Sequence, residues 1–451
     1  DLHLSLRRQR QMCIRDSSLT EKLLVVASKI SNQKHMYAIK TAFTTLMPVI
    51  ITGAFCTLIV NVVCSTETTG ISLAKVQGFS WLEMFTDLFN AANYATLNFF
   101  TIAAVVLIGL ELGVKNGIKG FMTGIVAVCS FVACLSTNIV ATVGEESITV
   151  AGIAKDYTAS KGLFLGMIIA LLSVELFTKL CKSKYLKINM PDSVPSNVTS
   201  SFNNLFPFAL TIIIFAAINY TVVQLAGLSL YDIIYTFIQK PLQAVVQGLP
   251  GVLLLMLVAQ IFWCVGIHGN QIIKPVRDPL LNAAILANTD IVANPNYNPA
   301  DLNIISMSFW DTYGNIGGSG CVVGLLIACL VFSKREDYKQ VAKLSIAPNI
   351  FNISETLHFG LPIMLNPLLM IPFIITPLAT MAFGYFMTII GFSDILVYAF
   401  PWTTPPFINA WIASGGSIGT VITQALCIVI SIAIYTPFVI IANKQKDIVS
   451  Q

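Results

Sequence analysis

Long apolar runs alternate along the chain with short polar segments. A transmembrane helix needs about 20 predominantly apolar residues, and most of these runs are close to that length. The runs lie at about residues 42–63, 97–112, 120–143, 162–180, 205–225, 245–265, 316–332, 365–390 and 418–441. The pattern predicts an all-α polytopic membrane protein with about ten transmembrane helices, one of which has to lie among the polar segments.

Two segments before the first run differ from this pattern. Residues 1–17 are basic and polar and contain too short an apolar stretch for a signal peptide, so we interpret them as a leader unrelated to the rest of the chain. Residues 18–40 are polar and amphipathic, which predicts an N-terminal interfacial helix that lies on the membrane surface.

The distribution of lysine and arginine predicts the orientation of the chain. Basic residues precede the first run, separate the second from the third, follow the fourth and the seventh, and recur in the C-terminal tail. Because positively charged loops remain in the cytoplasm, both termini are expected there. The chain must then cross outward at about residues 266–288, where charges and prolines predict a broken helix or a re-entrant hairpin that lines a cavity.

Polar interruptions gather in the second half of the chain. Besides residues 266–288, they comprise residues 345–367, with several amides and an acid, and residues 400–416, with three prolines and two tryptophans. The first half has ordinary apolar runs without comparable interruptions. We therefore expect a scaffold half at residues 18–195 and a substrate-binding half with re-entrant hairpins at residues 196–451.

The composition narrows the class of function. Hydrophobic residues make up 55% of the 451 residues and charged residues only 11%, whereas soluble domains carry about 25% charged residues. This leaves no room for a separate water-facing catalytic domain, and a net charge of +4 offers no basic face for nucleic acid. The ten cysteines form no CxxC pair and do not cluster with histidines, so we expect neither a metal site nor a cofactor.

Glu355 is the first candidate for a functional residue. An acid at the centre of a bilayer costs about 2.5–3.5 kcal/mol on insertion scales, so one embedded in an apolar segment needs a partner or a ligand. Asn349 and Asn352 lie close by in the sequence, and their amides can donate and accept hydrogen bonds, which suits an uncharged, polyhydroxylated substrate. The alternative is a carboxylate at the cytoplasmic rim that water solvates.

His268 is the second candidate, because two glycines flank it and let a ligand approach while its imidazole donates and accepts hydrogen bonds. Asn270 in the same turn is a further candidate for substrate binding. The alternative for His268 is a loop histidine that bonds to the backbone. His358 follows Glu355 by one helical turn and is either its partner or a residue of the membrane interface.

Trp402 is the third candidate, because an aromatic ring beside polar Thr403 and Thr404 can stack on the apolar face of a sugar ring. The alternative is a tryptophan of the aromatic belt at the membrane interface. The glycines at residues 314–320 follow no predicted strand and do not indicate a phosphate-binding loop.

At these segments the sequence resembles a known family. The stretch FNISETLHFGLPIMLNP is similar to the NINEP-x-x-FGLPI-x-x-NP signature of the membrane (IIC) subunit of the bacterial phosphotransferase system for lactose, cellobiose and diacetylchitobiose. The segments FWCVGIHG and FPWTTPP resemble two further motifs of that family and occur in the family's order. The resemblance extends from about residue 18 to the end of the chain.

The resemblance implies a dimerising first half and a second half that holds one disaccharide between re-entrant hairpins. In the family, the residues equivalent to Glu355 and His268 contact the sugar, and we expect them to form the catalytic pair. We assign Asn352 and Trp402 to the same cavity. The chain departs from the signature at two positions, Ser354 and Thr356, where the family has Asn and Pro.

The function implied by this resemblance is that of a sugar permease in a bacterial cell membrane. It would import a β-linked disaccharide of the cellobiose, diacetylchitobiose or lactose type and present the 6-hydroxyl to a phosphorylated IIB subunit, so that the phosphoryl-donor cysteine lies on another polypeptide. The expected partners are the disaccharide, the IIB subunit, a second copy of the chain and membrane lipid. Two alternatives remain, an ion-coupled sugar symporter and a sugar sensor that does not transport.

Overall fold

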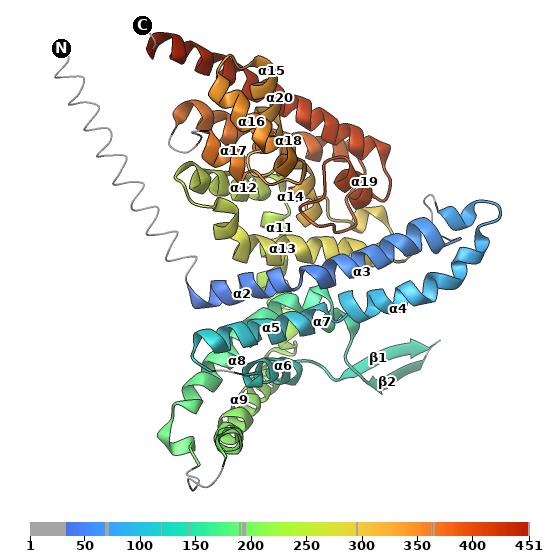
Figure 1. Ribbon diagram of the computed structural model, residues 1–451. Helices are drawn as coiled ribbons and strands as arrows, with labels where there is room; N and C mark the ends of the chain where they lie inside the picture. Colours follow the sequence, from blue (N-terminus) through green and yellow to red (C-terminus); the bar gives the residue numbers. More distant parts are fainter. Residues whose placement is uncertain are drawn as a thin grey trace, which may run out of the picture. The chain divides into compact units, whose positions relative to one another are not determined.

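The structure of the protein is a computed structural model that describes residues 33–67, 72–118, 120–143, 146–188, 191, 195–294, 296–361, 363 and 366–449. The predicted leader at residues 1–17 and most of the predicted interfacial helix at residues 18–40 lie outside these residues. The described chain is almost entirely helical, with a short two-stranded sheet (Figure 1).

The described residues pack into two compact units. The first unit comprises residues 34–245 and 278–301, and the second comprises residues 246–277 and the chain from residue 302 onward. Helix α13 (Gly269–Ile291) contributes to both units. The predicted division at residue 195 concerns function rather than packing, and it stays a prediction.

Small residues allow the helices of the first unit to pack closely. A Cβ atom at Gly109 of α5 would lie 2.7 Å from the Cβ atom of Ala127 in α6, and one at Gly166 of α8 would lie 2.7 Å from Val105 in α5. The helices of this unit are α2 (Lys34–Thr45), α3 (Met47–Ile59), α4 (Thr86–Leu97), α5 (Phe100–Lys115), α6 (Met122–Ala133), α7 (Lys155–Thr158), α8 (Leu163–Cys181), α9 (Ser196–Ala226), α10 (Leu230–Ile234) and α11 (Lys240–Val246). Shorter helical turns are η1 (Val60–Cys64), η2 (Leu73–Lys75), η3 (Ser80–Phe85), η4 (Ser160–Gly162), η5 (Lys184–Leu186), η6 (Tyr235–Gln239) and η7 (Pro299–Asp301).

The third apolar run, at residues 120–143, does not form a single span. Helix α6 ends at Ala133, and the remainder of the run becomes strand β1 (Asn138–Val143), which pairs antiparallel with β2 (Glu146–Ala151). The β-branched residues that fill both strands favour an extended backbone over a helix. The expectation of a helix across this whole run was therefore wrong.

The second unit is built on α15 (Val323–Phe332), α18 (Pro367–Ile389) and α20 (Ile418–Val449). A Cβ atom at Gly324 of α15 would lie 2.0 Å from the Oγ atom of Ser431 in α20, so a glycine is needed for this close approach. The other helices of the unit are α12 (Leu249–Cys264), α14 (Met307–Tyr313), α16 (Glu336–Ile350), α17 (Glu355–Gly360) and α19 (Ile408–Ser414).

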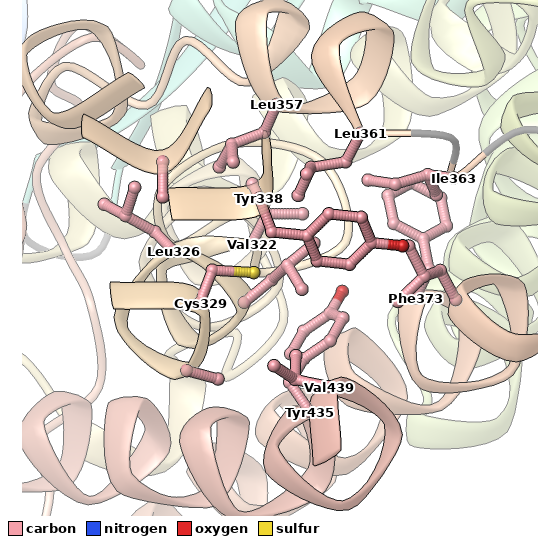
Figure 2. Packing of buried hydrophobic residues seen from close by; sticks show 14 of the residues in the cluster. Val322, Leu326, Cys329, Tyr338, Leu357, Leu361, Ile363, Phe373, Tyr435 and Val439 are labelled. Carbon is pink, nitrogen blue, oxygen red and sulfur yellow. The ribbon is translucent and has the colours of Figure 1, made fainter. Parts of the chain in front are cut away.

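A hydrophobic core in the second unit anchors the helix that carries Glu355. Leu357 in α17 and Leu361, which follows its last residue, are buried in a cluster with Tyr338 of α16, Phe373 of α18 and residues of α15 and α20 (Figure 2). Burial of a leucine side chain contributes about 1.5–3 kcal/mol. This packing fixes the position of a six-residue helix that could not be stable alone.

Among the described residues, six helices are long and apolar enough to cross a membrane, and a seventh span results if residues 230–246 and 249–264 count as one broken helix. This number is below the expected ten, because α6 with 12 residues and α15 with 10 are too short to span alone. For the segment at 266–288, the expectation of a broken helix is wrong, whereas that of a re-entrant hairpin stays a prediction. This segment forms a turn followed by the continuous helix α13, in which Pro275 and Pro279 do not break the helix.

Candidate functional site

Two glycines with different roles place His268 at the start of α13. Gly266 adopts a positive φ of 84°, which turns the chain after α12 ends at Cys264. A Cβ atom at Gly269 would lie 1.8 Å from the carbonyl oxygen of Ala259, so only glycine allows α13 to begin against the backbone of α12. The sequence GIHG therefore presents the imidazole of His268 from a tightly fixed turn.

Glu355 begins α17 and faces His268. The Nε2 atom of His268 lies 3.6 Å from the Oε1 atom of Glu355, and the two side chains are 41% and 45% exposed. The distance exceeds that of a direct hydrogen bond, which is about 2.7–3.2 Å. An imidazole and a carboxylate at this distance, both partly accessible, can both contact one hydroxyl group that lies beside the pair.

His358 has a different environment from His268. Its side chain is buried, and its Nε2 atom lies 3.2 Å from the carbonyl oxygen of Ser319. Because a carbonyl only accepts hydrogen bonds, Nε2 carries the proton. The buried indole of Trp263 contacts both imidazoles, with ring centroids 4.3 Å from His268 and 4.6 Å from His358. His358 thus packs behind the site, and His268 is the imidazole that faces Glu355.

The glycine loop at residues 314–320 lies directly against the other polar residues of the site. Asn270 donates from Nδ2 to the Oγ atom of Ser319 at 2.9 Å, and Asn349 donates from Nδ2 to the carbonyl oxygen of Gly317 at 2.5 Å. Gly318 has a φ of +99°, and a Cβ atom there would lie 2.5 Å from that of Ser354. The glycines therefore serve close packing within the second unit.

Asn352 joins three segments of the site. Its Oδ1 atom accepts a hydrogen bond from the amide of Gly317 at 2.9 Å, and its Nδ2 atom donates to the carbonyl oxygens of Trp402 and Thr404, each at 2.9 Å. Asn352 is only 4% exposed, whereas Trp402 is 44% exposed. The indole of Trp402 is thus accessible on a loop whose backbone Asn352 holds.

The six residues predicted for the site differ in what they offer a ligand. His268, Glu355 and Trp402 have accessible side chains, whereas Asn349 and Asn352 are buried and bonded to the backbone, and Asn270 is bonded to Ser319. Whether these residues contact a sugar stays a prediction.

Sequence reasoning missed the contributions of Trp263 and of the glycine loop. The sequence GNIGGSG carried a signal for the loop, since a dense group of glycines at the start of an apolar run indicates positive φ angles or close packing. Trp263 lies inside an apolar run and carries no local signal that separates it from ordinary core residues.

Comparison with known proteins identifies the family. Residues 40–377 match the family described as "Phosphotransferase system, EIIC". The chain belongs to this EIIC family. It is 33% identical over 441 residues to the lichenan permease IIC component of Bacillus subtilis (strain 168), covering 95% of this chain and 93% of the relative. It is 30% identical to the cellobiose-specific EIIC component of Lactococcus lactis subsp. lactis (strain IL1403), covering 95% and 98% of the two chains.

A solved structure of an EIIC protein has the same fold as this chain. The transporter ChbC, the IIC component from the N,N'-diacetylchitobiose-specific phosphotransferase system, matches with a TM-score of 0.85 and 30% identity, over 95% of this chain and 98% of that one. The predicted helical membrane fold and the predicted family are thereby confirmed. This EIIC protein is a multi-pass sugar permease of the cellobiose and lactose family in the bacterial plasma membrane, and it works with a sugar substrate and a IIB partner.

Proposed function

We propose that this EIIC protein imports a β-linked disaccharide of the cellobiose, diacetylchitobiose or lactose type and presents its 6-hydroxyl to a separate, phosphorylated IIB subunit. The observation that carries this proposal is the pair of His268 and Glu355, which face each other at 3.6 Å with both side chains partly exposed. Trp402, exposed on the neighbouring loop, supplies an aromatic face on which a pyranose ring can stack. We assign Asn270, Asn349 and Asn352 to the same site.

The proposed chemistry is a direct phosphoryl transfer. The sugar's 6-oxygen attacks the phosphorus of a phosphocysteine on the IIB subunit, the new O–P bond forms as the S–P bond breaks, and the hydroxyl proton passes to the carboxylate of Glu355. His268 holds the hydroxyl group in line, so its contribution is one of orientation. The product carries a dianionic phosphate, which prevents its return across the membrane.

The orientation of the protein belongs to the same proposal. The excess of lysine and arginine in alternate loops favours cytoplasmic N- and C-termini, and the sugar would therefore enter from the opposite side. By resemblance to the family, residues 18–195 would form the scaffold through which two copies associate, and residues 196–451 would carry the sugar.

Reconstituted vesicles test this function. Phosphoenolpyruvate, the general phosphotransferase proteins and a purified IIB subunit are placed on the cytoplasmic side, and labelled cellobiose, diacetylchitobiose and lactose are supplied on the other. We expect sugar phosphate to form from at least one of them and uptake to be insensitive to an uncoupler. Unmodified sugar and uptake that an uncoupler abolishes would instead indicate an ion-coupled symporter. Binding without uptake would indicate a sensor.

A further inference from the structure

We propose that Asn352 is a positioning residue of the sugar site, which ends helix α16 with its backbone and fixes two loops beside Glu355 with its side chain. This inference depends on the proposed function only in that Glu355 binds the sugar. It is supported by two separate sets of hydrogen bonds made by one residue. Each set constrains a different part of the site.

The backbone of Asn352 stops α16 immediately before the residues that lead to Glu355. Its φ of +60° lies in the left-handed region. Its amide donates to the carbonyl oxygen of Asn349, and the amide of Ile353 donates to that of Pro348, both at 3.0 Å. These two bonds are the Schellman arrangement, which satisfies the last carbonyls of a helix and requires a left-handed residue, usually glycine or asparagine. The chain therefore reverses at a defined place, and α17 starts at Glu355.

The side chain of Asn352 fixes the loops on either side. It accepts from the amide of Gly317 and donates to the carbonyl oxygens of Trp402 and Thr404, all at 2.9 Å. Both amide hydrogens are thus in use, and only lone-pair capacity on Oδ1 remains. With 4% exposure, Asn352 acts on a sugar through the positions of Glu355 and Trp402.

Asparagine combines two roles at this position that glycine and aspartate do not combine. Glycine would accept the left-handed backbone but has no side chain to hold the loops. Aspartate would tolerate the backbone and accept from Gly317, but it would place a carboxylate against two carbonyl oxygens. The substitutions N352G and N352D therefore separate the side-chain role from the helix-ending role.

The experiment measures sugar binding and amide hydrogen exchange on the purified full-length protein. Labelled cellobiose, diacetylchitobiose and lactose are the probes, and the sugar that wild type binds most tightly is used for the variants. We expect N352G and N352D to bind it about tenfold more weakly, which corresponds to the loss of one or two net hydrogen bonds. We also expect faster exchange at the amide of Gly317 in N352G, which removes the acceptor of that amide.

Asn443 offers a matched control. Its side chain also makes three hydrogen bonds, accepting from Ser333 and Lys334 and donating to the carbonyl oxygen of Phe332, at the junction of α15 and α20. N443A should leave both the sugar affinity and the exchange at Gly317 unchanged. The proposal is overturned if N352G binds sugar like wild type, or if exchange at Gly317 is unaltered in N352G. If wild type binds sugar without phosphorylating it, the proposed function fails, whereas the exchange comparison still decides the role of Asn352.

Discussion

The Nε2 atom of His268 and the Oε1 atom of Glu355 lie 3.6 Å apart, each on a partly exposed side chain. E355Q keeps the shape of the residue but removes the proton acceptor. We expect the rate of sugar phosphorylation at saturating sugar to fall about 10²–10⁴-fold, which is the usual contribution of a positioned base. The measurement is the amount of labelled sugar phosphate formed in vesicles that contain the partner proteins.

Glu336 provides the control for this substitution. It is an exposed acid at the start of α16, where its carboxylate accepts a hydrogen bond from Gln340 at 2.8 Å. E336Q should phosphorylate sugar at the wild-type rate. Wild-type uptake and phosphorylation by E355Q would show that Glu355 has no catalytic role.

Trp263 fills the space between the imidazoles of His268 and His358 and is only 3% exposed. W263A should lower the free energy of unfolding by about 3–5 kcal/mol, because it leaves a large cavity. W263F should cost less, because it keeps an aromatic ring there. Equilibrium unfolding in detergent measures both, and W81A is the control, since Trp81 is 56% exposed. An equal loss of stability in W81A and W263A would contradict this account.

Alanine substitutions at Gly318 and Gly391 distinguish the free-energy cost of backbone strain from that of steric overlap. Both have a positive φ, of 99° and 76°, but a Cβ atom at Gly318 would meet Ser354 at 2.5 Å, whereas none lies within 4 Å at Gly391. G391A should therefore cost only the left-handed conformation, about 1–2 kcal/mol. G318A should cost a further 1–3 kcal/mol or so, because the neighbours must move. Equal unfolding free energies for the two variants would argue against tight packing of the glycine loop.

Tyr435 connects α20 to the glycine loop at residues 314–320 through a hydrogen bond. Its hydroxyl donates to the carbonyl oxygen of Gly320 at 2.8 Å, and the ring is completely buried in the core of the second unit (Figure 2). Y435F should lower the free energy of unfolding by about 1–3 kcal/mol, because a buried acceptor loses its partner. Y185F, at a residue that is 98% exposed, should change it by less than about 0.5 kcal/mol. The prediction fails if Y435F unfolds like wild type.

Hydrophobic patterning predicted the membrane class, and it counted ten spans where six or seven helices of the described residues are long and apolar enough to cross. The run that contains α6 looked long enough to cross the bilayer, but its second part pairs with residues 146–151, and a partner strand cannot be seen from one run alone. In α13, two prolines suggested a break, yet the helix is continuous from Gly269 to Ile291. Tertiary context decided both cases, because local propensities are weak compared with packing.

The sequence predicted those site residues whose neighbours along the chain distinguish them. The glycines around His268 and the acid at Glu355 are conspicuous in an apolar chain, and the structure brings these two residues together. The role of Asn352 could not be read from the sequence, because its partners at Gly317, Trp402 and Thr404 lie 35, 50 and 52 residues away. The spacing to Glu355 identified the amide of Asn352 as one that could bind a sugar. It could not show that this amide already makes hydrogen bonds to the protein backbone.

The side chain of Asn352 makes its three hydrogen bonds to backbone atoms of Gly317, Trp402 and Thr404. These hydrogen bonds do not depend on which side chains are present at residues 402 and 404, provided that the backbone conformation there is unchanged. Those two positions can therefore be randomised in a directed-evolution library without loss of the three hydrogen bonds of Asn352, although a change at Trp402 also changes the aromatic face proposed for the sugar. Asn352 is thus the residue that has to be kept, whereas the side chains at residues 402 and 404 can be changed without affecting its hydrogen bonds.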